Sequence, residues 1–470
     1  MSKKIVARVF DLDPALQCIA QCIAAPRDVL TFLSAFPTLP TPLTALRQLL
    51  SNPLAAILVL DAMPVFPALQ VDNPYTWWLG DPRSLDDFAQ LVDAWGEKLT
   101  HLRLCHVSVE ADLPILIALL ERCTRLEVVR VENVHDKDLV AAVTSAGHCV
   151  RHLDIKTTYR HDAEVEWAER LRPWLRSGYA SHLGFADADE DGRDVARVLA
   201  DASSLSSLDL TIWSMPPVQD AEPRLENVTK VRVLDFSTDG LFTSWLFGRL
   251  YLGSLVSISF ACDSVVSVDF SDIFSALPLL QELEVCNAHI VHVEPPPAVI
   301  STALRRVAFI NVGFFLASLD ALVACISHSP VLETLTWSDS TSCAPVIVDA
   351  FVTFGSQWVG QGVREVDLVN HAIGNKEASS LAVALCGASS PTGCRFDLTQ
   401  NHIGEEGYVA LLDALTTCTR VTLWLDPNWA PLAAEAATRN LVVQDMVIWH
   451  YPVLGVPNPV VCVSSQSTLG

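Results

Sequence analysis

The sequence has few basic residues for its acidic content, and this shortage limits the kinds of partner it can have. Its 470 residues contain 31 lysines and arginines against 54 aspartates and glutamates, giving a formal net charge of −23. Binding to nucleic acids relies on clustered lysine and arginine at the phosphate backbone. The composition therefore argues against a nucleic-acid partner and favours a protein partner.

The sequence also lacks long hydrophobic runs and paired cysteines. No apolar segment reaches the roughly 18 residues that a membrane-spanning helix needs, and Asp11 and Asp13 interrupt the start before a signal-like core forms. The thirteen cysteines are scattered without paired spacing, which is typical of reduced thiols. We therefore expect an intracellular protein, cytoplasmic or nuclear, with no membrane contact.

The common catalytic signatures are missing as well. The sequence contains no glycine-rich phosphate loop, no Gly-x-Ser-x-Gly motif and no His-Glu-x-x-His motif, so we expect no enzyme activity and no cofactor or metal. Asp187, Asp189 and Asp191 followed by Gly192 resemble the start of a calcium loop. Val198 stands where the loop needs a glutamate, so an acidic loop is the better interpretation.

What the sequence does contain is a short repeated pattern of three apolar residues at positions 1, 4 and 6. It recurs thirteen times between Leu99 and Asp426. Successive copies begin roughly 27 residues apart, which lies within the range of repeat lengths in leucine-rich repeats. Clear copies are Leu99-Thr-His-Leu102-Arg-Leu104, Leu126-Glu-Val-Val129-Arg-Val131 and Val150-Arg-His-Leu153-Asp-Ile155, and a further copy is assigned to Val231, Leu234 and Phe236. Each unit exposes an apolar edge that only its neighbour can cover. The pattern predicts an α/β leucine-rich-repeat solenoid, a horseshoe with parallel strands on its concave face and helices outside.

The segments between these strands have helical spacing. Two examples have residues three and four apart, as on one face of a helix, namely Ile115, Ala118, Leu119 and Arg122, and Leu319, Leu322, Val323 and Ile326. The repeat that starts at Phe396 is the most complete. Its Asn401 is expected to bond the backbone, Gly404 and Gly407 to allow a tight turn, and Leu411 and Leu415 to pack inward. This stretch closely resembles the ribonuclease-inhibitor class of leucine-rich repeat.

The pattern divides the chain into four parts. Residues 8–50 form a helical module or N-terminal cap, 51–98 a junction with irregular first repeats, 99–440 the repeats, and 441–470 a C-terminal cap with a mobile tail. In the junction, Ile57-Leu58-Val59-Leu60 is a candidate first strand.

The helical module has two apolar stripes separated by Pro26. Its order of residues resembles the first two helices of an F-box, which docks on a Skp-type adaptor in cullin ubiquitin ligases. The resemblance implies adaptor binding by Leu12, Pro14, Leu16, Ile19, Ile23 and Leu30. The alternative is that these helices cap the first repeat and hide its apolar edge.

The residue between the last two apolar positions of each strand is expected to point outward from the concave face, because strand side chains alternate. The candidate partner-binding residues at this position are Arg103, Arg130, Asp154, Asp209, Asp235, Glu284, Asp367, Asp397 and Trp424. The row begins basic and becomes acidic, which favours a partner that presents lysine or arginine to the acidic part. Leucine-rich repeats also carry aspartate there for reasons unrelated to ligands. The histidines nearby, His101, His152 and His182, are expected at the surface rather than in catalysis.

These observations lead to one functional hypothesis and two alternatives. The chain is expected to bind a protein target on the concave face and to recruit it to a cullin ubiquitin ligase through the F-box-like segment. The first alternative is a repeat scaffold or inhibitor without a ligase link. The second, regulation resembling Ran GTPase activation, depends on repeat type alone.

Overall fold

The computed structural model of the protein describes residues 26–39, 43–44, 47, 68–72, 89, 92–93, 100–105, 113–132, 137–145, 147–157, 167–187, 199, 202–212, 225–236, 246, 248–269, 279–292, 303–314, 316–339, 344–448 and 458–465. The chain forms two compact units, Met1–Asn227 and Val228–Gly470, and each is described by itself. No helix within the described ranges is long and apolar enough to cross a membrane.

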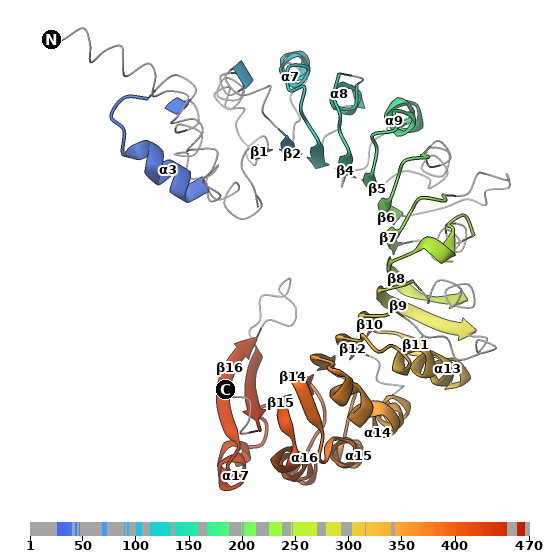
Figure 1. Cartoon of the computed structure of the whole chain (residues 1–470), viewed down its shortest axis with the longest axis vertical. Coiled ribbons are helices and arrows are strands. Elements are labelled where there is room, and N and C mark those ends of the chain that lie inside the picture. The colour runs from blue at the N-terminus through green and yellow to red at the C-terminus, as the bar shows by residue number, and fades with distance from the viewer. Residues whose placement is uncertain are drawn as a thin grey trace. The chain divides into compact units, whose positions relative to one another are not determined.

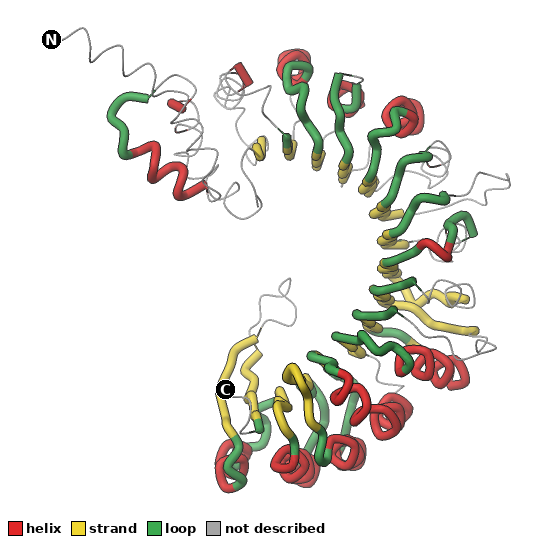
Figure 2. Tube along the Cα trace, in the orientation of Figure 1, coloured by secondary structure: helices red, strands yellow, loops and turns green. Residues whose placement is uncertain are grey.

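The first unit contains parallel strands that pair with one another in chain order (Figure 1). The strands are β1 (Ala68–Asp72), β2 (His101–Cys105), β3 (Val128–Glu132), β4 (His152–Thr157), β5 (His182–Asp187) and β6 (Ser207–Ile212). The helices are α3 (Pro26–Ser34), α7 (Leu113–Leu120), α8 (Lys137–Val143) and α9 (Trp167–Arg176). Helices α7, α8 and α9 each connect two successive strands and lie on one side of them (Figure 2). This is the predicted strand-and-helix repeat.

The apolar positions of the repeat form the core of this unit. The second and third apolar residues of the first three copies are buried, namely Leu102, Leu104, Val129, Val131, Leu153 and Ile155. In α7 the buried residues are Leu116, Leu119 and Leu120, whereas Ile115 is 51% exposed. Of the four predicted inner positions, only Leu119 is buried, while Ile115, Ala118 and Arg122 are exposed. The prediction is wrong because α7 is apolar on nearly every side, so its spacing does not fix which side faces the sheet.

The second unit repeats this architecture with longer helices. Its strands are β7 (Lys230–Asp235), β8 (Ser257–Asp269), β9 (Glu282–His292), β10 (Arg306–Ile310), β11 (Gly313–Phe314), β12 (Thr334–Ser338), β13 (Glu365–Asp367), β14 (Ser389–Asp397), β15 (Thr419–Leu425), β16 (Val442–Ile448) and β17 (Asn458–Ser464). Its helices are the short η2 (Leu252–Ser254), α13 (Leu316–Ser327), α14 (Ala344–Gln361), α15 (Asn375–Leu385), α16 (Glu405–Thr417) and α17 (Leu432–Thr438). Parallel pairing runs in chain order from β7 to β10, continues to β12, and ends at β15. The predicted inner face of α13 is confirmed, because Leu319, Leu322, Val323 and Ile326 are all buried.

Two regions of the second unit depart from the simple repeat. Strands β8 and β9 continue as a parallel pair beyond a register shift between Ala261 and Val266, so extended chain takes the place where a returning helix is expected. At the other end, β17 pairs antiparallel with both β15 and β16. This hairpin covers the edge of β15, in the segment where the sequence predicts a C-terminal cap.

The predicted bonds between Asn401 and the backbone are confirmed. The Asn401 side-chain oxygen accepts bonds from the backbone N–H groups of His371 and Ile373, and its amide nitrogen donates to the carbonyls of Leu368 and Leu398. The side chain thereby joins two neighbouring repeats. The predicted packing of Leu411 and Leu415 is also confirmed, since both are buried.

The two glycines of that repeat have a different role from the predicted tight turn. Gly404 precedes α16 with extended backbone, and Gly407 lies inside the helix. A Cβ atom at Gly407 would lie 2.8 Å from Ile403 Cγ2 and 3.0 Å from Ala378 Cβ. Glycine is therefore needed for the close approach of α15 and α16.

The N-terminal predictions fall largely outside the described residues. This applies to Leu12, Pro14, Leu16, Ile19 and Ile23 of the F-box-like segment, and to the candidate first strand at residues 57–60. The second predicted helix is present as α3, which begins at Pro26 and buries Leu33. The first described strand is β1, which pairs with β2.

Candidate functional site

The strand register of the first unit places the predicted outward residues in one row. Arg103 lies opposite Arg130, Arg130 opposite Asp154, Asp154 opposite Gly184, and Gly184 opposite Asp209. Arg130 is exposed, and Asp154 and Asp209 are half-buried, while the apolar residues on either side of them in each strand are buried on the other face. The predicted row is confirmed as a row of positions across β2 to β6.

A second row on the same face lies two residues earlier in each strand. It contains His101, Val128, His152, His182 and Ser207. The two rows meet at a group that we call the histidine cluster, made of His152, Asp154 and His182. It combines one residue of the predicted row with two histidines that were expected only at the surface.

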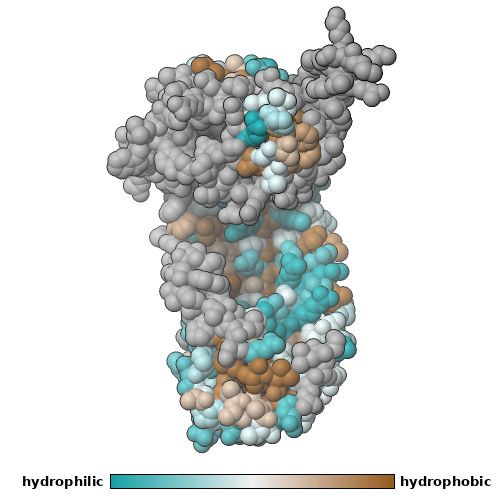
Figure 3. Space-filling view, turned by 90° about the vertical axis from the view of Figure 1, so that its left-hand side faces the viewer, coloured by the Kyte–Doolittle hydropathy of each residue, from teal (hydrophilic) through white to brown (hydrophobic). Residues whose placement is uncertain are grey.

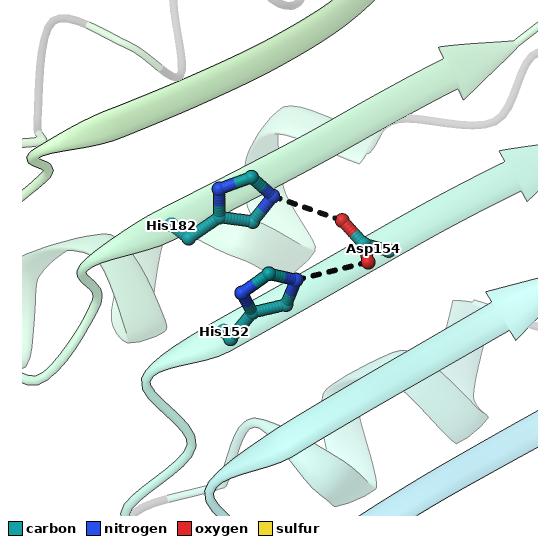
Figure 4. A group of neighbouring side chains, drawn as sticks. All are labelled: His152, Asp154 and His182. Carbon is teal, nitrogen blue, oxygen red and sulfur yellow. Dashed lines mark hydrogen bonds and ion pairs between the residues drawn. The ribbon is translucent and has the colours of Figure 1, made fainter. Parts of the chain in front are cut away.

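The histidine cluster is tightly arranged (Figure 4). His152 Nε2 lies 2.9 Å from Asp154 Oδ2, and His182 Nε2 lies 3.0 Å from Asp154 Oδ1. The two imidazole rings stack with their centroids 3.8 Å apart and an interplanar angle of 13°. Both rings therefore direct the same nitrogen at one carboxylate.

Two further side chains hold this arrangement from outside. Arg130 Nε donates to Asp154 Oδ2 at 3.0 Å, and His182 Nδ1 lies 3.0 Å from the Ser207 hydroxyl. Burial alone would raise the pKa of Asp154, but the hydrogen bonds from His152 and His182 outweigh it and hold the pKa well below its usual range. The Asp154 carboxylate is therefore ionised throughout the physiological range.

Gly184 makes room for this carboxylate on the adjacent strand. A Cβ atom at Gly184 would lie 2.1 Å from Asp154 Oδ1 and 3.1 Å from Asp154 Cγ. Any side chain at this position would displace the carboxylate from its place beside His182. Within the described residues, the histidine cluster is also the group whose potential metal-ligand atoms all lie within 4.8 Å of one another.

The strand register places the predicted residues of the second unit in one row, except at its first position. Its members are Arg232, Ser259, Glu284, Ala308, Thr336, Asp367, Asp397 and Trp424, each opposite the next. Asp235 was predicted in this row, but it is fully buried. The prediction is wrong because Val231 and Val233 are the residues that face the core of β7, so the outward position between them belongs to Arg232.

The acidic end of this second row is occupied largely by local contacts. Asp397 is 3% exposed and accepts bonds from the backbone N–H and the hydroxyl of Thr399. Asp367 accepts a hydrogen bond from the Val369 N–H. Its burial, and to a smaller extent the negative charge of Asp397, raise the pKa of Asp367 to about 7. These contacts support the ligand-independent explanation for these two aspartates.

Strand β9 carries two glutamates on this face, Glu282 and Glu284. Glu284 is exposed and accepts a bond from Ser259, and Glu282 accepts one from Ser257. Further along the sheet, the Arg395 guanidinium carbon lies 3.9 Å from the centre of the Trp424 ring, and Arg395 pairs with Glu365. In the space-filling view, the described surface shows hydrophilic residues with hydrophobic residues among them (Figure 3).

Sequence reasoning missed the histidine cluster although a signal was present. His152 and His182 both stand directly before the second apolar residue of consecutive repeats, so the repeat alignment places them side by side. Of the predicted adaptor-binding residues, only Leu30 is described, and it is half-buried on α3.

No family model and no curated protein matches the chain. A similar solved structure is the crystal structure of the TLR13–ssRNA13 complex, with 15% sequence identity and a TM-score of 0.37. The match covers 71% of this chain and 43% of that chain, so this chain spans less than half the length of that protein. The parallel pairing, the buried repeat positions and the Asn401 contacts show that the described part of the chain contains units of the leucine-rich-repeat type.

Proposed function

We propose that this protein is a binding protein, with no catalytic role, whose exposed sheet face holds a protein partner. The observation that carries the proposal is the alternation along the strands. One face buries the repeat residues, and the other displays charged and polar side chains in rows. Stacked repeats are commonly used as such extended surfaces.

The charge of the molecule favours a partner with a basic surface. The net charge of −23 attracts basic proteins over distances limited by salt. On the sheet face, Asp209 of the first unit and Glu284 of the second are accessible to such a partner. Asp235 is removed from this part of the hypothesis because it is buried.

Site-specific photo-crosslinking tests which side of the protein binds. A crosslinking residue is placed at Thr336, on the sheet face, or at Val383, on the helix side and 73% exposed. The proposal predicts a covalent adduct with the partner from Thr336 and none from Val383. Adducts from Val383 alone would place binding on the helices and overturn it.

A charge variant then tests the proposed chemistry. Changing Asp209→Asn together with Glu284→Gln is expected to weaken partner binding by about tenfold, which corresponds to about 1.4 kcal/mol. The matched control is Asp349→Asn with Glu406→Gln, which changes the net charge equally at exposed positions of α14 and α16. Equal effects of the two pairs would show that overall charge, and not the sheet face, determines binding.

The F-box resemblance extends the proposal to recruitment of the partner to a cullin ubiquitin ligase. The support is the resemblance itself together with α3, a helix in the segment where the second helix of such a module is expected. Free cysteines in the described residues suit the intracellular setting that this role needs.

The test uses the full-length protein and a purified Skp-type adaptor. The wild-type chain is expected to retain the adaptor, and Leu16→Glu with Leu30→Glu is expected to lose it. Thr31→Glu, an exposed position on α3, is the control that keeps it. If the wild-type chain fails to bind the adaptor, the scaffold or inhibitor alternative holds.

A further inference from the structure

We propose that His152, Asp154 and His182 form a binding site for a divalent transition-metal ion of the zinc class. The ligands are Nε2 of each histidine and one carboxylate oxygen. This site is separate from partner binding and does not depend on it.

The spacing of the ligand atoms fits such an ion. Around a tetrahedral zinc ion with bonds of about 2.0–2.1 Å, neighbouring ligand atoms lie about 3.3 Å apart. His182 Nε2 lies 3.0 Å from Asp154 Oδ1, whereas His152 Nε2 lies 2.9 Å from Oδ2, and the potential ligand atoms all lie within 4.8 Å of one another. An ion therefore needs the stacked rings to rotate so that both nitrogens converge on the side of Oδ1.

The charges also favour an ion at this point. The carboxylate of Asp154 is ionised and receives both histidine nitrogens at once. The two imidazoles stack 3.8 Å apart beside this carboxylate, and neutral imidazoles together with a carboxylate are forms that bind a metal ion.

The surrounding residues act as supports of the kind that metal ligands require. When Nε2 of His182 gives up its hydrogen bond to Asp154 and binds a metal ion, the ring proton lies on Nδ1, which then donates to the Ser207 hydroxyl. Arg130 holds Oδ2 of Asp154, which leaves Oδ1 as the ligating oxygen. Gly184 leaves the space in which that oxygen lies.

The donor set selects the class of metal. Two imidazoles and one carboxylate suit zinc, copper, nickel or cobalt better than calcium or magnesium, which prefer oxygen ligands. All three side chains remain partly exposed, between 17 and 29%. Water can therefore complete the coordination.

The test is titration of the metal-free, full-length protein with Zn²⁺ alone, measured by isothermal titration calorimetry. His152→Gln and His182→Gln are each expected to weaken the affinity of one zinc-binding event by at least about tenfold. Mutating residues that merely support metal ligands already lowers metal affinity by about this factor. His402→Gln changes an exposed histidine of the second unit and is the control that keeps this event. Cysteine thiolates also bind zinc, but the cysteines are identical in all four proteins.

Gly184→Ala provides a variant in which all three ligand residues are unchanged. Its Cβ atom displaces Oδ1 of Asp154, so the same binding event is expected to weaken, whereas circular dichroism shows the metal-free fold unchanged. Zinc is also expected to raise the thermal midpoint of the wild-type protein more than that of His182→Gln. Identical zinc titrations for the wild-type, His152→Gln and His182→Gln proteins would overturn the proposal, whatever the outcome for Gly184→Ala.

Discussion

Two aspartates on the sheet face show how strongly neighbours determine the behaviour of one residue type. Asp154 is surrounded by two histidines and Arg130, whose contacts favour its charged form. Asp367 is half-buried beside Asp397, and burial together with the charge of Asp397 disfavours its charged form. The same position in the repeat therefore holds a permanent negative charge in one unit and a titrating group in the other.

The raised pKa of Asp367 makes stability depend on pH in a defined direction. A folded-state pKa of about 7, against the usual 3.8, means that the folded protein binds this proton more tightly than the unfolded chain does. The stabilisation from this group is therefore present at pH 4 and is lost as the pH rises towards 7. Asp367→Asn keeps an oxygen for the Val369 N–H and is expected to stabilise the protein by about 1 to 3 kcal/mol at pH 8, with little effect at pH 4.

Urea unfolding at the two pH values measures this difference. Asp349→Asn, at an exposed position of α14, is the control and should change stability little at either pH. A similar gain for Asp367→Asn at both pH values would show that proton binding is not its cause.

Individual residues also show where sequence reasoning succeeds and where it stops. The register of nearly the whole outward row was predictable, because alternation along a strand is local. Asp235 was misplaced because the repeat there offers apolar residues at both Val233 and Leu234, and only packing selects Val233 for the core. The histidine cluster depends on contacts between β4 and β5, so it becomes visible only when two repeats are aligned.

At the scale of elements, close packing decides where a helix needs glycine. Gly407 of α16 is buried against Ile403 and Ala378, whereas Gly360 of α14 is exposed and a Cβ atom there would meet nothing within 4 Å. Sequence alone cannot separate these two helical glycines, because the difference lies in the neighbouring repeat. This is also why the predicted tight turn at Gly407 was wrong.

The two glycines predict opposite effects of the same substitution. Gly407→Ala is expected to destabilise the protein by about 1 to 3 kcal/mol, since the added methyl group overpacks the contact with α15. Gly360→Ala is expected to stabilise it by up to about 1 kcal/mol through helix propensity. Chemical denaturation of both variants measures the pair, and a gain in stability for Gly407→Ala would contradict the close contact.

At the scale of the whole molecule, the repeat type could be predicted because its period recurs thirteen times, whereas the form of the C-terminal cap could not. The cap of the second unit is a β-hairpin whose strand β17 lies between β15 and β16, antiparallel to both. Its residues Val460 to Val463 are buried. Nothing in the repeat pattern specifies such a strand.

Removing residues 441–470 is expected to lower the thermal midpoint and to cause aggregation, because the backbone edge of β15 and its apolar neighbours become exposed. A chain that ends after Ser465 retains β17 and is the control. Light scattering during thermal unfolding distinguishes the two shortened proteins. Equal solubility and equal midpoints would show that the hairpin does not protect this edge.

The position of β17 also has a consequence for the order of events during synthesis on the ribosome. Strand β16 leaves the ribosome before β17, yet β17 is the strand that joins it to β15. The edge of β15 therefore stays unpaired until the ribosome has synthesised β17. Until then, this edge is open to other nascent chains or to chaperones.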